Sequence, residues 1–193
     1  MKKLCVFTGS SSGVRPEYTA AARQLGLALA QQRIALVYGG ARVGLMGMLA
    51  DAALGAGGHV IGVMPEALIA KEVAHRGLSE LKVVKSMHER KALMAEISDG
   101  FVAMPGGFGT LDELFEILTW AQLGFHRKPC GLLNAHGYFD SLLDFVAHSV
   151  AEGFVRKEHA AMLAVASSAP ALLEMLASYQ PPIVEKWIER AET

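Results

Sequence analysis

Residues 105–113, with the sequence PGGFGTLDE, hold the sharpest chemical signal in the chain. A short apolar run ends at Pro105, and three glycines follow within four residues. Thr110 is placed to cap a following helix, with Asp112 and Glu113 in the first turn. Bare backbone N–H groups and the helix dipole would then favour an anion at one point. The segment therefore predicts a phosphate site.

A structural explanation of the same segment is a capping box. In a capping box, a carboxylate near the start of a helix stabilises the helix end and binds no ligand. This explanation accounts for one acidic residue, but it does not account for the three glycines that precede the helix.

A second candidate is the run MHERK at residues 87–91, which opens another predicted helix. Arg90 and Lys91 fall in its first turn, where the helix dipole disfavours cations. Breaking a local rule at the edge of a sheet is typical of a functional site. Arginine can hold a phosphate with two parallel hydrogen bonds. The alternative is a solvated helix face, on which Glu89 pairs with either cation.

Two more glycine-rich loops follow short apolar runs: TGSSSG at residues 8–13 and GGARVGLMG at residues 39–47. In the first, a ligand loop and a plain strand-to-helix turn are comparable interpretations. In the second, flexible N–H groups lead into a helix N-terminus, which favours an anion. Ala41 breaks the dinucleotide pattern GxGxxG, and no Lys-Ser/Thr pair completes a P-loop.

Composition excludes several classes of protein. The chain has 193 residues, with 52% hydrophobic and 19% charged residues, which argues against disorder. Its 18 Lys and Arg against 19 Asp and Glu indicate no nucleic-acid partner. The apolar runs are shorter than the ~20 residues of a membrane helix, and the run at the N-terminus is shorter than a signal peptide needs. We expect a cytoplasmic protein that binds no membrane.

The cysteines and histidines indicate neither a metal site nor a disulfide. Cys5 and Cys130 each lie inside an apolar run, so we expect buried, reduced thiols. The string that starts at His88-Glu89 resembles HExxH, but Ala92 stands where the second histidine should be. We expect no metal and no cofactor.

Apolar runs and helical periodicities alternate along the chain. They predict strands at 4–7, 34–38, 59–64, 81–84, 101–104 and 129–133. They predict helices at 17–32, 45–55, 87–97, 111–123, 138–152 and 169–179, with a loop and short helix in 66–80. The fold class is α/β, a doubly wound, Rossmann-like parallel sheet flanked by helices on both faces. We expect one domain over residues 1–180 and a short tail over 181–193. In such sheets, ligands bind beyond the carboxyl ends of the strands, where the glycine loops lie.

Together, MHERK and PGGFGTLDE resemble the LOG (Lonely Guy) family of cytokinin riboside 5′-monophosphate phosphoribohydrolases, which has AMP-cleaving bacterial relatives. The resemblance extends from the Gly9 loop to about residue 180. It implies hydrolysis of the N-glycosidic bond of AMP or an N6-substituted AMP to the free base and ribose 5-phosphate. Some relatives carry the older label lysine decarboxylase, but no lysine here has the sequence context of a pyridoxal phosphate site.

The resemblance also implies roles for individual residues. Arg90 and Glu113 match the catalytic pair of the family. The residues implied or expected to bind substrate are Glu72, Lys91, Gly106, Gly107, Phe108, Gly109, Thr110, Thr119, Gly9, Ser10, Gly39 and Gly40. The family usually has three glycines where this chain has Gly39-Gly40-Ala41, and alanine disfavours positive φ, so we expect a modest change of loop geometry.

The helix predicted at 111–123 is apolar on nearly all its faces. A helix of this kind is deeply buried, and a chain of this size has little room for it inside one subunit. A symmetric homodimer, which the family resemblance also implies, would bury it.

Three other functions fit the same pattern of loops. A nucleotide-binding module without catalysis would use the glycine loops, with Glu113 as a helix cap only. An NAD(P)-dependent oxidoreductase could use the same fold, although GxGxxG is missing. A phosphoribosyltransferase-like enzyme would need pyrophosphate and usually a metal.

Overall fold

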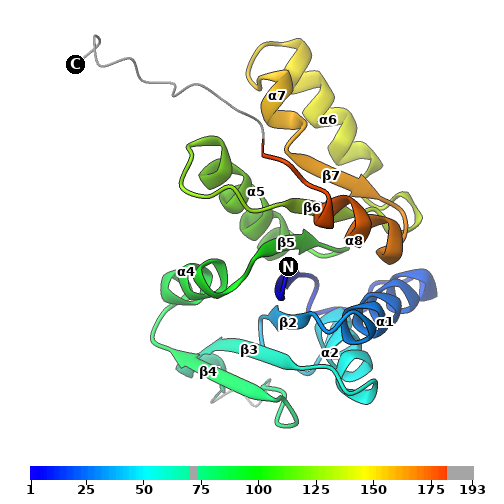
Figure 1. Cartoon of the computed structure of the whole chain (residues 1–193), viewed down its shortest axis with the longest axis vertical. Helices are drawn as coiled ribbons and strands as arrows, with labels where there is room; N and C mark the ends of the chain where they lie inside the picture. The colour runs from blue at the N-terminus through cyan, green and yellow to red at the C-terminus, as the bar shows by residue number, and fades with distance from the viewer. Residues whose placement is uncertain (70–73, 182–193) are drawn as a thin grey trace.

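The computed structural model describes residues 1–69 and 74–181, and its centre is a seven-stranded parallel sheet (Figure 1). The strand order is β4-β3-β2-β1-β5-β6-β7. The strands are β1 Lys3–Phe7, β2 Ala35–Tyr38, β3 Val60–Pro65, β4 Glu80–Val84, β5 Gly100–Ala103, β6 Cys130–Leu133 and β7 Leu163–Ala166. This arrangement confirms the predicted α/β, doubly wound fold.

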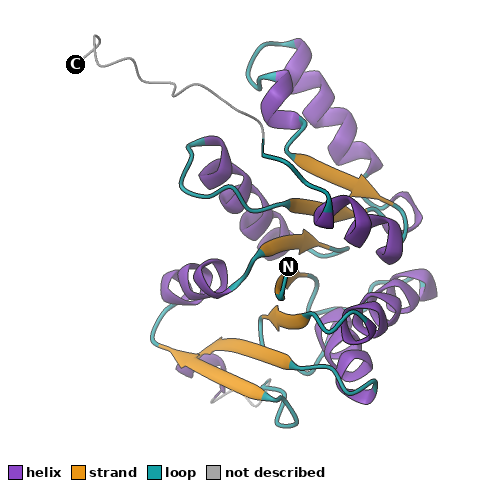
Figure 2. Cartoon of the chain, in the orientation of Figure 1, coloured by secondary structure: helices purple, strands orange, loops and turns teal. Residues whose placement is uncertain are grey.

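Helices connect the strands and cover both faces of the sheet (Figure 2). They are α1 Pro16–Gln31, α2 Gly44–Gly55, α3 Glu66–Ile69, α4 Met87–Ile97, α5 Phe108–Gln122, the short 3-10 helix η1 Ala135–Gly137, α6 Asp140–Ala151, α7 Lys157–Ala160 and α8 Ala169–Ala177. None of the helices within 1–69 and 74–181 is long and apolar enough to cross a bilayer.

The alternation of side chains along β1 builds two separate cores. Leu4 and Val6 pack with residues of α1, α2 and α8 on one face. Cys5 and Phe7 pack with residues of α4 and α5 on the other. Figure 1 shows α1 and α2 on one side of the sheet and α4 and α5 on the other. A strand buried on both faces explains why β1 is a continuous apolar run rather than an alternating one.

The strand order reverses at β1, which pairs with β2 on one side and with β5 on the other. Such a switch point opens a crevice between the loops that follow the two central strands. Here those loops are residues 8–13 after β1 and 104–107 after β5. The sheet therefore brings two of the predicted glycine loops together.

The structure contains elements that the sequence pattern did not predict. β7 and α7 lie in the stretch 153–168, to which no element was assigned. The four residues of β7 are only half-buried, so their apolar signal is short and weak. In the described part of 66–80, α3 is the expected short helix. The predicted tail begins at Pro181, and its remaining residues, 182–193, lie outside the described residues.

The two cysteines are free and buried, as expected. Burial in the apolar core raises the pKa of Cys130 to about 12. Burial also raises the pKa of Cys5 well above its usual value. Both side chains are therefore neutral thiols at physiological pH, which is the state of inert core cysteines.

Candidate functional site

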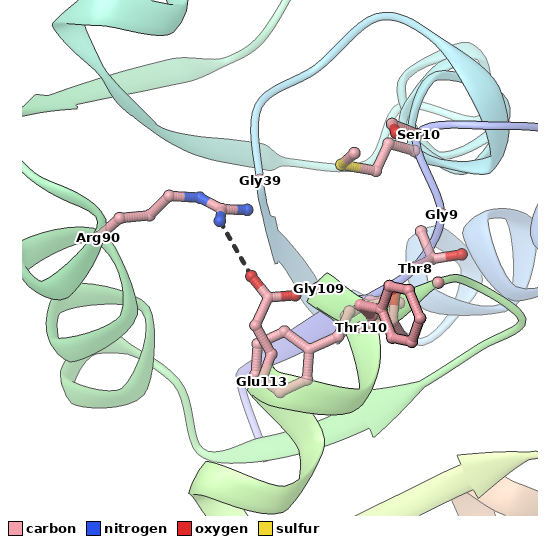
Figure 3. Close-up of a pocket in the computed structure, with 13 residues that line it drawn as sticks. Thr8, Gly9, Ser10, Gly39, Arg90, Gly109, Thr110 and Glu113 are labelled. Atoms are coloured by element: carbon pink, nitrogen blue, oxygen red, sulfur yellow. Dashed lines mark ion pairs between the residues drawn. The ribbon is translucent and has the colours of Figure 1, made fainter.

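A cleft of about 280 Å³ opens at the carboxyl ends of β1, β2 and β5 (Figure 3). Three glycine-containing segments and one face each of α4 and α5 form its wall. The lining residues are Val6, Phe7, Thr8, Gly9, Ser10, Gly39, Met46, Arg90, Gly107, Phe108, Gly109, Thr110 and Glu113. This volume is at the lower end for a small-molecule site, so a nucleotide would fill it and extend beyond its mouth.

The N-terminus of α5 points its first amides at this cleft. Gly107 is the N-cap, and the N–H of Leu111 donates to the carbonyl of Gly107 at 3.2 Å. The first four N–H groups of a helix have no partner within the helix, and the four residues that carry them here, Gly107 to Thr110, all line the cleft. Together with the helix dipole, they make an anion site.

The start of α5 differs from the prediction. The helix begins at Phe108, so Thr110 is its third residue and not its cap. Asp112 and Glu113 consequently lie in the second turn. The capping-box interpretation of either carboxylate is therefore wrong, because a residue in the second turn cannot reach the end of the helix. Glu113 points into the cleft instead.

Arg90 and Glu113 form an ion pair across the cleft, with 3.0 Å between Arg90 Nη1 and Glu113 Oε1. Figure 3 shows the two side chains reaching toward one another from different helices. Both are nearly buried, with side-chain exposures of 11% and 10%. Arg90 Nε also donates to the carbonyl of Val63 at 3.1 Å. A buried pair of this kind costs desolvation free energy, and such pairs are common where function requires them.

Burial raises the pKa of the Glu113 carboxyl above its ordinary value, although the positive charge of Arg90 opposes this rise. The nearby Asp112 also raises this pKa, and Lys91 lowers it. A carboxyl group with a raised pKa can hold or release a proton closer to neutral pH than an exposed one. The cleft thus has one group suited to acid–base chemistry beside one permanent cation.

The helix that carries Arg90 begins with a well-made cap. The side chain of Ser86 accepts a hydrogen bond from the N–H of Glu89 at 3.1 Å, and Glu89 Oε2 accepts one from the N–H of Lys85 at 2.8 Å. This reciprocal pattern fixes the first turn of α4. Arg90 is the fourth residue of that helix and turns inward to the cleft.

The loop after β2 shapes the cleft mainly through its glycines. A Cβ at Gly39 would collide with the guanidinium of Arg90, so only glycine leaves room for that group. Gly44 has φ of +62°, and a Cβ there would collide with the backbone of Ser10. The amides of Leu45 and Met46, at the start of α2, donate to carbonyl oxygens of the loop after β1 at 3.4 and 3.3 Å. The N-terminus of α2 therefore holds the loop after β1 in place.

Ala41, the departure from three consecutive glycines, is accommodated without strain. The non-glycine residues with positive φ within 1–69 and 74–181 are Arg33 and His136, so position 41 does not require glycine. Ala41 forms an isolated antiparallel bridge with Ala74. Its carbonyl accepts a hydrogen bond from the hydroxyl of Tyr38 at 3.2 Å.

Nine of the residues expected from the sequence line the cleft: Gly9, Ser10, Gly39, Arg90, Gly107, Phe108, Gly109, Thr110 and Glu113. Gly106 lies behind the cleft wall, where a Cβ would collide with the side chain of Thr110. Gly40 packs against Met64 and Leu81. Glu72 lies outside the described residues.

Lys91 and Thr119 lie away from the cleft in this chain. Lys91 Nζ pairs with Asp112 Oδ2 at 3.1 Å and with Glu116 Oε1 at 3.0 Å. Partial burial lowers the pKa of Lys91, but the hydrogen bonds to Glu116 and Asp112 outweigh it and raise that pKa. Thr119 is exposed on α5, and its hydroxyl donates to the carbonyl of Phe115 at 2.7 Å. Lys91 therefore links α4 to α5.

Four lining residues were not singled out from the sequence: Val6, Phe7, Thr8 and Met46. Thr8 carries a clear role, because its hydroxyl donates to the carbonyl of Pro105 at 3.0 Å. The N–H of Gly9 donates to the same oxygen at 3.1 Å. The sequence does indicate Thr8, because this threonine ends the first apolar run and precedes Gly9.

The described ranges 1–69 and 74–181 hold no group of three or more His, Cys, Asp or Glu side chains that could bind a metal ion. The charged groups that line the cleft are Arg90 and Glu113.

Comparison with known proteins identifies relatives over nearly the whole chain. The family model described as "Possible lysine decarboxylase" matches residues 46–176. The cytokinin riboside 5′-monophosphate phosphoribohydrolase LOG7 of Arabidopsis thaliana is 50% identical over 184 residues, which cover 95% of this chain and 85% of that protein. The enzyme of the same name from Rhodococcoides fascians is 54% identical over 155 residues, which cover 80% of this chain and 78% of that protein.

The fold also resembles the solved structure of a more distant protein. The molybdenum cofactor binding protein from Rippkaea orientalis superposes with a TM-score of 0.70 and 24% identity, covering 92% of this chain and 97% of that one. At this identity the likeness shows a shared fold.

Proposed function

We infer the reaction from one premise: the chain belongs to the LOG family of cytokinin riboside 5′-monophosphate phosphoribohydrolases. It is an N-glycosyl hydrolase that splits a nucleoside 5′-monophosphate into the free base and ribose 5-phosphate. The structural observation that best supports this function is the buried ion pair of Arg90 and Glu113 beside the N-terminus of α5. For the same chain we propose a cytoplasmic location, from the sequence reasoning given above.

We assign the chemical step to Glu113. Breaking a ribosyl–base bond passes through a state with positive charge at the anomeric carbon, as glycoside hydrolysis does. The carboxylate stabilises that charge, and its Oε2 accepts the proton of the attacking water. The water oxygen bonds to C1′ while the electron pair of the C1′–N bond leaves with the base. The departing base takes up a proton from solvent, and Glu113 returns the proton of the attacking water to solvent, so the products balance as free base and ribose 5-phosphate.

Arg90 orients Glu113 and supplies positive charge. A guanidinium does not give up its proton at neutral pH, so it is not the acid that protonates the base. Its hydrogen bonds to Glu113 and to Val63 fix it from two directions. It therefore holds the carboxylate in one geometry and offers its remaining donors to an anionic substrate.

The phosphate binds at the start of α5, against residues Gly107–Thr110. Amides at a helix N-terminus favour a dianion, and the hydroxyls of Thr8 and Ser10 lie along the same wall. Fixing the phosphate places the ribose over Glu113, so binding energy remote from the reacting bond aids the reaction.

The base lies at the mouth of the cleft, beside Phe108. The ring of Phe108 is 93% exposed, so it adds little to folding and is available to stack on a purine. A base stacked on the exposed Phe108 can be adenine or N6-substituted adenine, because an added apolar group changes the affinity only modestly. AMP and N6-substituted AMP are the proposed substrates.

We propose that two copies form a homodimer through the outer face of α5. Within the chain, Phe115, Leu123 and Phe125 are 39%, 58% and 75% exposed. The subunit therefore leaves one face of α5 and the turn that follows it uncovered, and a second copy would cover this apolar surface. Thr119 lies on the same face, where it would meet the partner. Sedimentation equilibrium at micromolar concentration tests the dimer, and a monomer would contradict it.

The decisive experiment incubates the purified protein with AMP in EDTA, in parallel with Glu113→Gln. Chromatography then measures free adenine and ribose 5-phosphate. Release by the wild type alone supports metal-independent hydrolysis through Glu113. Glutamine keeps the size and an acceptor oxygen at this position, so a loss of activity reports the missing carboxylate.

Other outcomes separate the alternatives. Equal release by both proteins would remove Glu113 from the mechanism. No release from AMP or from N6-isopentenyl AMP would favour a nucleotide-binding module without catalysis. A requirement for pyrophosphate and metal would indicate phosphoribosyl transfer.

A further inference from the structure

A tyrosine outside the cleft is hydrogen-bonded to the loop that forms its wall. The hydroxyl of Tyr138 donates to the carbonyl oxygen of Gly106 at 2.6 Å. Tyr138 does not line the cleft, whereas Gly107, the next residue after its partner, does. The bond therefore acts on the glycine loop from the side opposite to the substrate.

The turn that carries Tyr138 is built to hold it. Asn134 Oδ1 accepts the N–H of Phe139 at 2.8 Å, and Asn134 Nδ2 donates to Asp140 Oδ1 at 2.7 Å. His136 adopts a left-handed backbone with φ of +54°, and its Nε2 lies 2.7 Å from Nη1 of Arg15. A non-glycine residue in that region costs free energy, and such residues cluster at functional sites.

Aromatic neighbours fix the ring of Tyr138 from two sides. The ring of Tyr18 meets it edge-on at 5.4 Å between centroids, and the ring of Phe139 does so at 4.8 Å. Tyr18 also packs against Gly13, in the loop after β1. The aromatic pair of Tyr18 and Tyr138 thus connects the turn that carries Tyr138 to the loops after β1 and β5.

Peptide geometry turns this bond into a constraint on the cleft. The described peptide bonds are all trans, so the carbonyl of Gly106 and the N–H of Gly107 point in opposite directions. Because the carbonyl of Gly106 is hydrogen-bonded to Tyr138, the N–H of Gly107 points away from Tyr138. The preceding carbonyl, of Pro105, is held by Thr8 and Gly9. Two successive carbonyls are therefore anchored just before the phosphate-binding amides.

We propose that Tyr138 is a positioning residue for the phosphate site: its hydroxyl sets the peptide plane that aims the Gly107 amide at the phosphate. The inference rests on the proposed function, because it assigns the ligand of that amide. Tyr138 touches neither substrate nor reacting atoms and acts through Gly106.

The test compares Tyr138→Phe with Tyr18→Phe. Each removes one hydroxyl and keeps the ring, but only the hydroxyl of Tyr138 bonds Gly106. Calorimetry measures binding of ribose 5-phosphate and of adenosine, which lacks the phosphate. Steady-state assays with AMP give kcat and KM, and thermal melts check folding.

We expect Tyr138→Phe to weaken ribose 5-phosphate binding by about five- to tenfold, the net effect of one hydrogen bond. Adenosine binding stays as in the wild type. The ratio kcat/KM for AMP falls by at least a similar factor, because the phosphate contact also places the ribose over Glu113. Tyr18→Phe matches the wild type in all of these.

Several results would overturn the inference. Unchanged ribose 5-phosphate binding in Tyr138→Phe, in an enzyme that still cleaves AMP, removes the positioning role and leaves the reaction intact. An equal loss in Tyr18→Phe, or an equal loss of adenosine binding, assigns the effect to general packing. A wild type that neither cleaves AMP nor binds ribose 5-phosphate defeats the proposed function and this inference with it.

Discussion

The guanidinium of Arg90 occupies the space that a side chain at Gly39 would fill. Arg90 lies on α4 and Gly39 opens the loop after β2, so the two are far apart in sequence and packed together in the fold. This contact joins one glycine loop directly to the ion pair to which we assign the reaction, because Arg90 also holds Glu113.

Replacing Gly39 with alanine should therefore cost activity. The methyl group displaces the guanidinium, and a misplacement of about 1 Å at a catalytic group lowers the rate on the order of 100-fold. We expect kcat/KM for AMP to fall by at least about that factor. Gly55→Ala is the matched control, because a Cβ at the end of α2 meets nothing within 4 Å. Near-normal activity in Gly39→Ala would show that the pair needs no exact placement of Arg90.

The raised pKa of Glu113 should appear in the pH dependence of the reaction. If the carboxylate is the active form, activity falls as pH drops through this pKa. Because burial raises the pKa, the fall begins at a higher pH than for an ordinary glutamate. The phosphate of AMP also ionises, near pH 6, so the profile of kcat is measured with substrate saturating. An acid limb at the ordinary glutamate value would contradict this prediction.

Replacing Lys91 tests whether the acid limb of the pH profile belongs to Glu113. The positive charge of Lys91 lowers the pKa of Glu113, so Lys91→Met should move the acid limb to higher pH. The substrate phosphate contributes equally in both enzymes. Lys85→Met is the control, since Lys85 is exposed just before α4. A limb that stays in place in Lys91→Met would mean that it belongs to another group.

The same substitution should also lower stability. Lys91 joins α4 to Asp112 and Glu116 of α5, and its loss leaves two carboxylates near each other. Asp112 is 64% exposed, so screening by water limits the effect to about 0.5–1.5 kcal/mol. Urea unfolding of Lys91→Met and Lys85→Met measures the difference. Equal stability of the two variants would remove the structural role.

Phe108→Ala should weaken substrate binding without destabilising the fold. Stacking of an aromatic ring on a base contributes about 1–3 kcal/mol, so KM should rise by about tenfold or more. The ring is almost fully exposed, so the melting temperature should not change. Phe154→Ala is the control, because Phe154 is 88% exposed and does not line the cleft. Equal kinetics in both variants would place the base elsewhere.

The sequence predicted the glycine loops well because each carries a local signal. Backbone that must turn sharply or approach a ligand needs glycine, and a parallel sheet collects such loops at one edge. Arg90 and Glu113 followed from their motifs, and the fold brings them within hydrogen-bonding distance. The start of α5 was misplaced by three residues, since helix boundaries depend on local capping geometry.

Other residues could not be placed from motifs alone. Thr119 follows Glu113 by six residues, or roughly 240° around a helix, so the two face different directions. Lys91 follows Arg90 directly and likewise points elsewhere. Tyr138 carried no signal, because its role depends on a hydrogen bond to a residue 32 positions away. Such contacts arise from tertiary structure and leave no periodic trace.

The cleft draws its wall from both halves of the sheet, with Gly39 on the side of β2 and Gly107 on the side of β5. A nucleotide seated there fastens the two halves together, so its binding opposes global unfolding. At a concentration of 100 times Kd, this adds about 2.7 kcal/mol, which is several degrees in melting temperature. The melting temperatures of Glu113→Gln with different nucleotides would then rank the affinities for nucleotides that differ in their base, without any turnover.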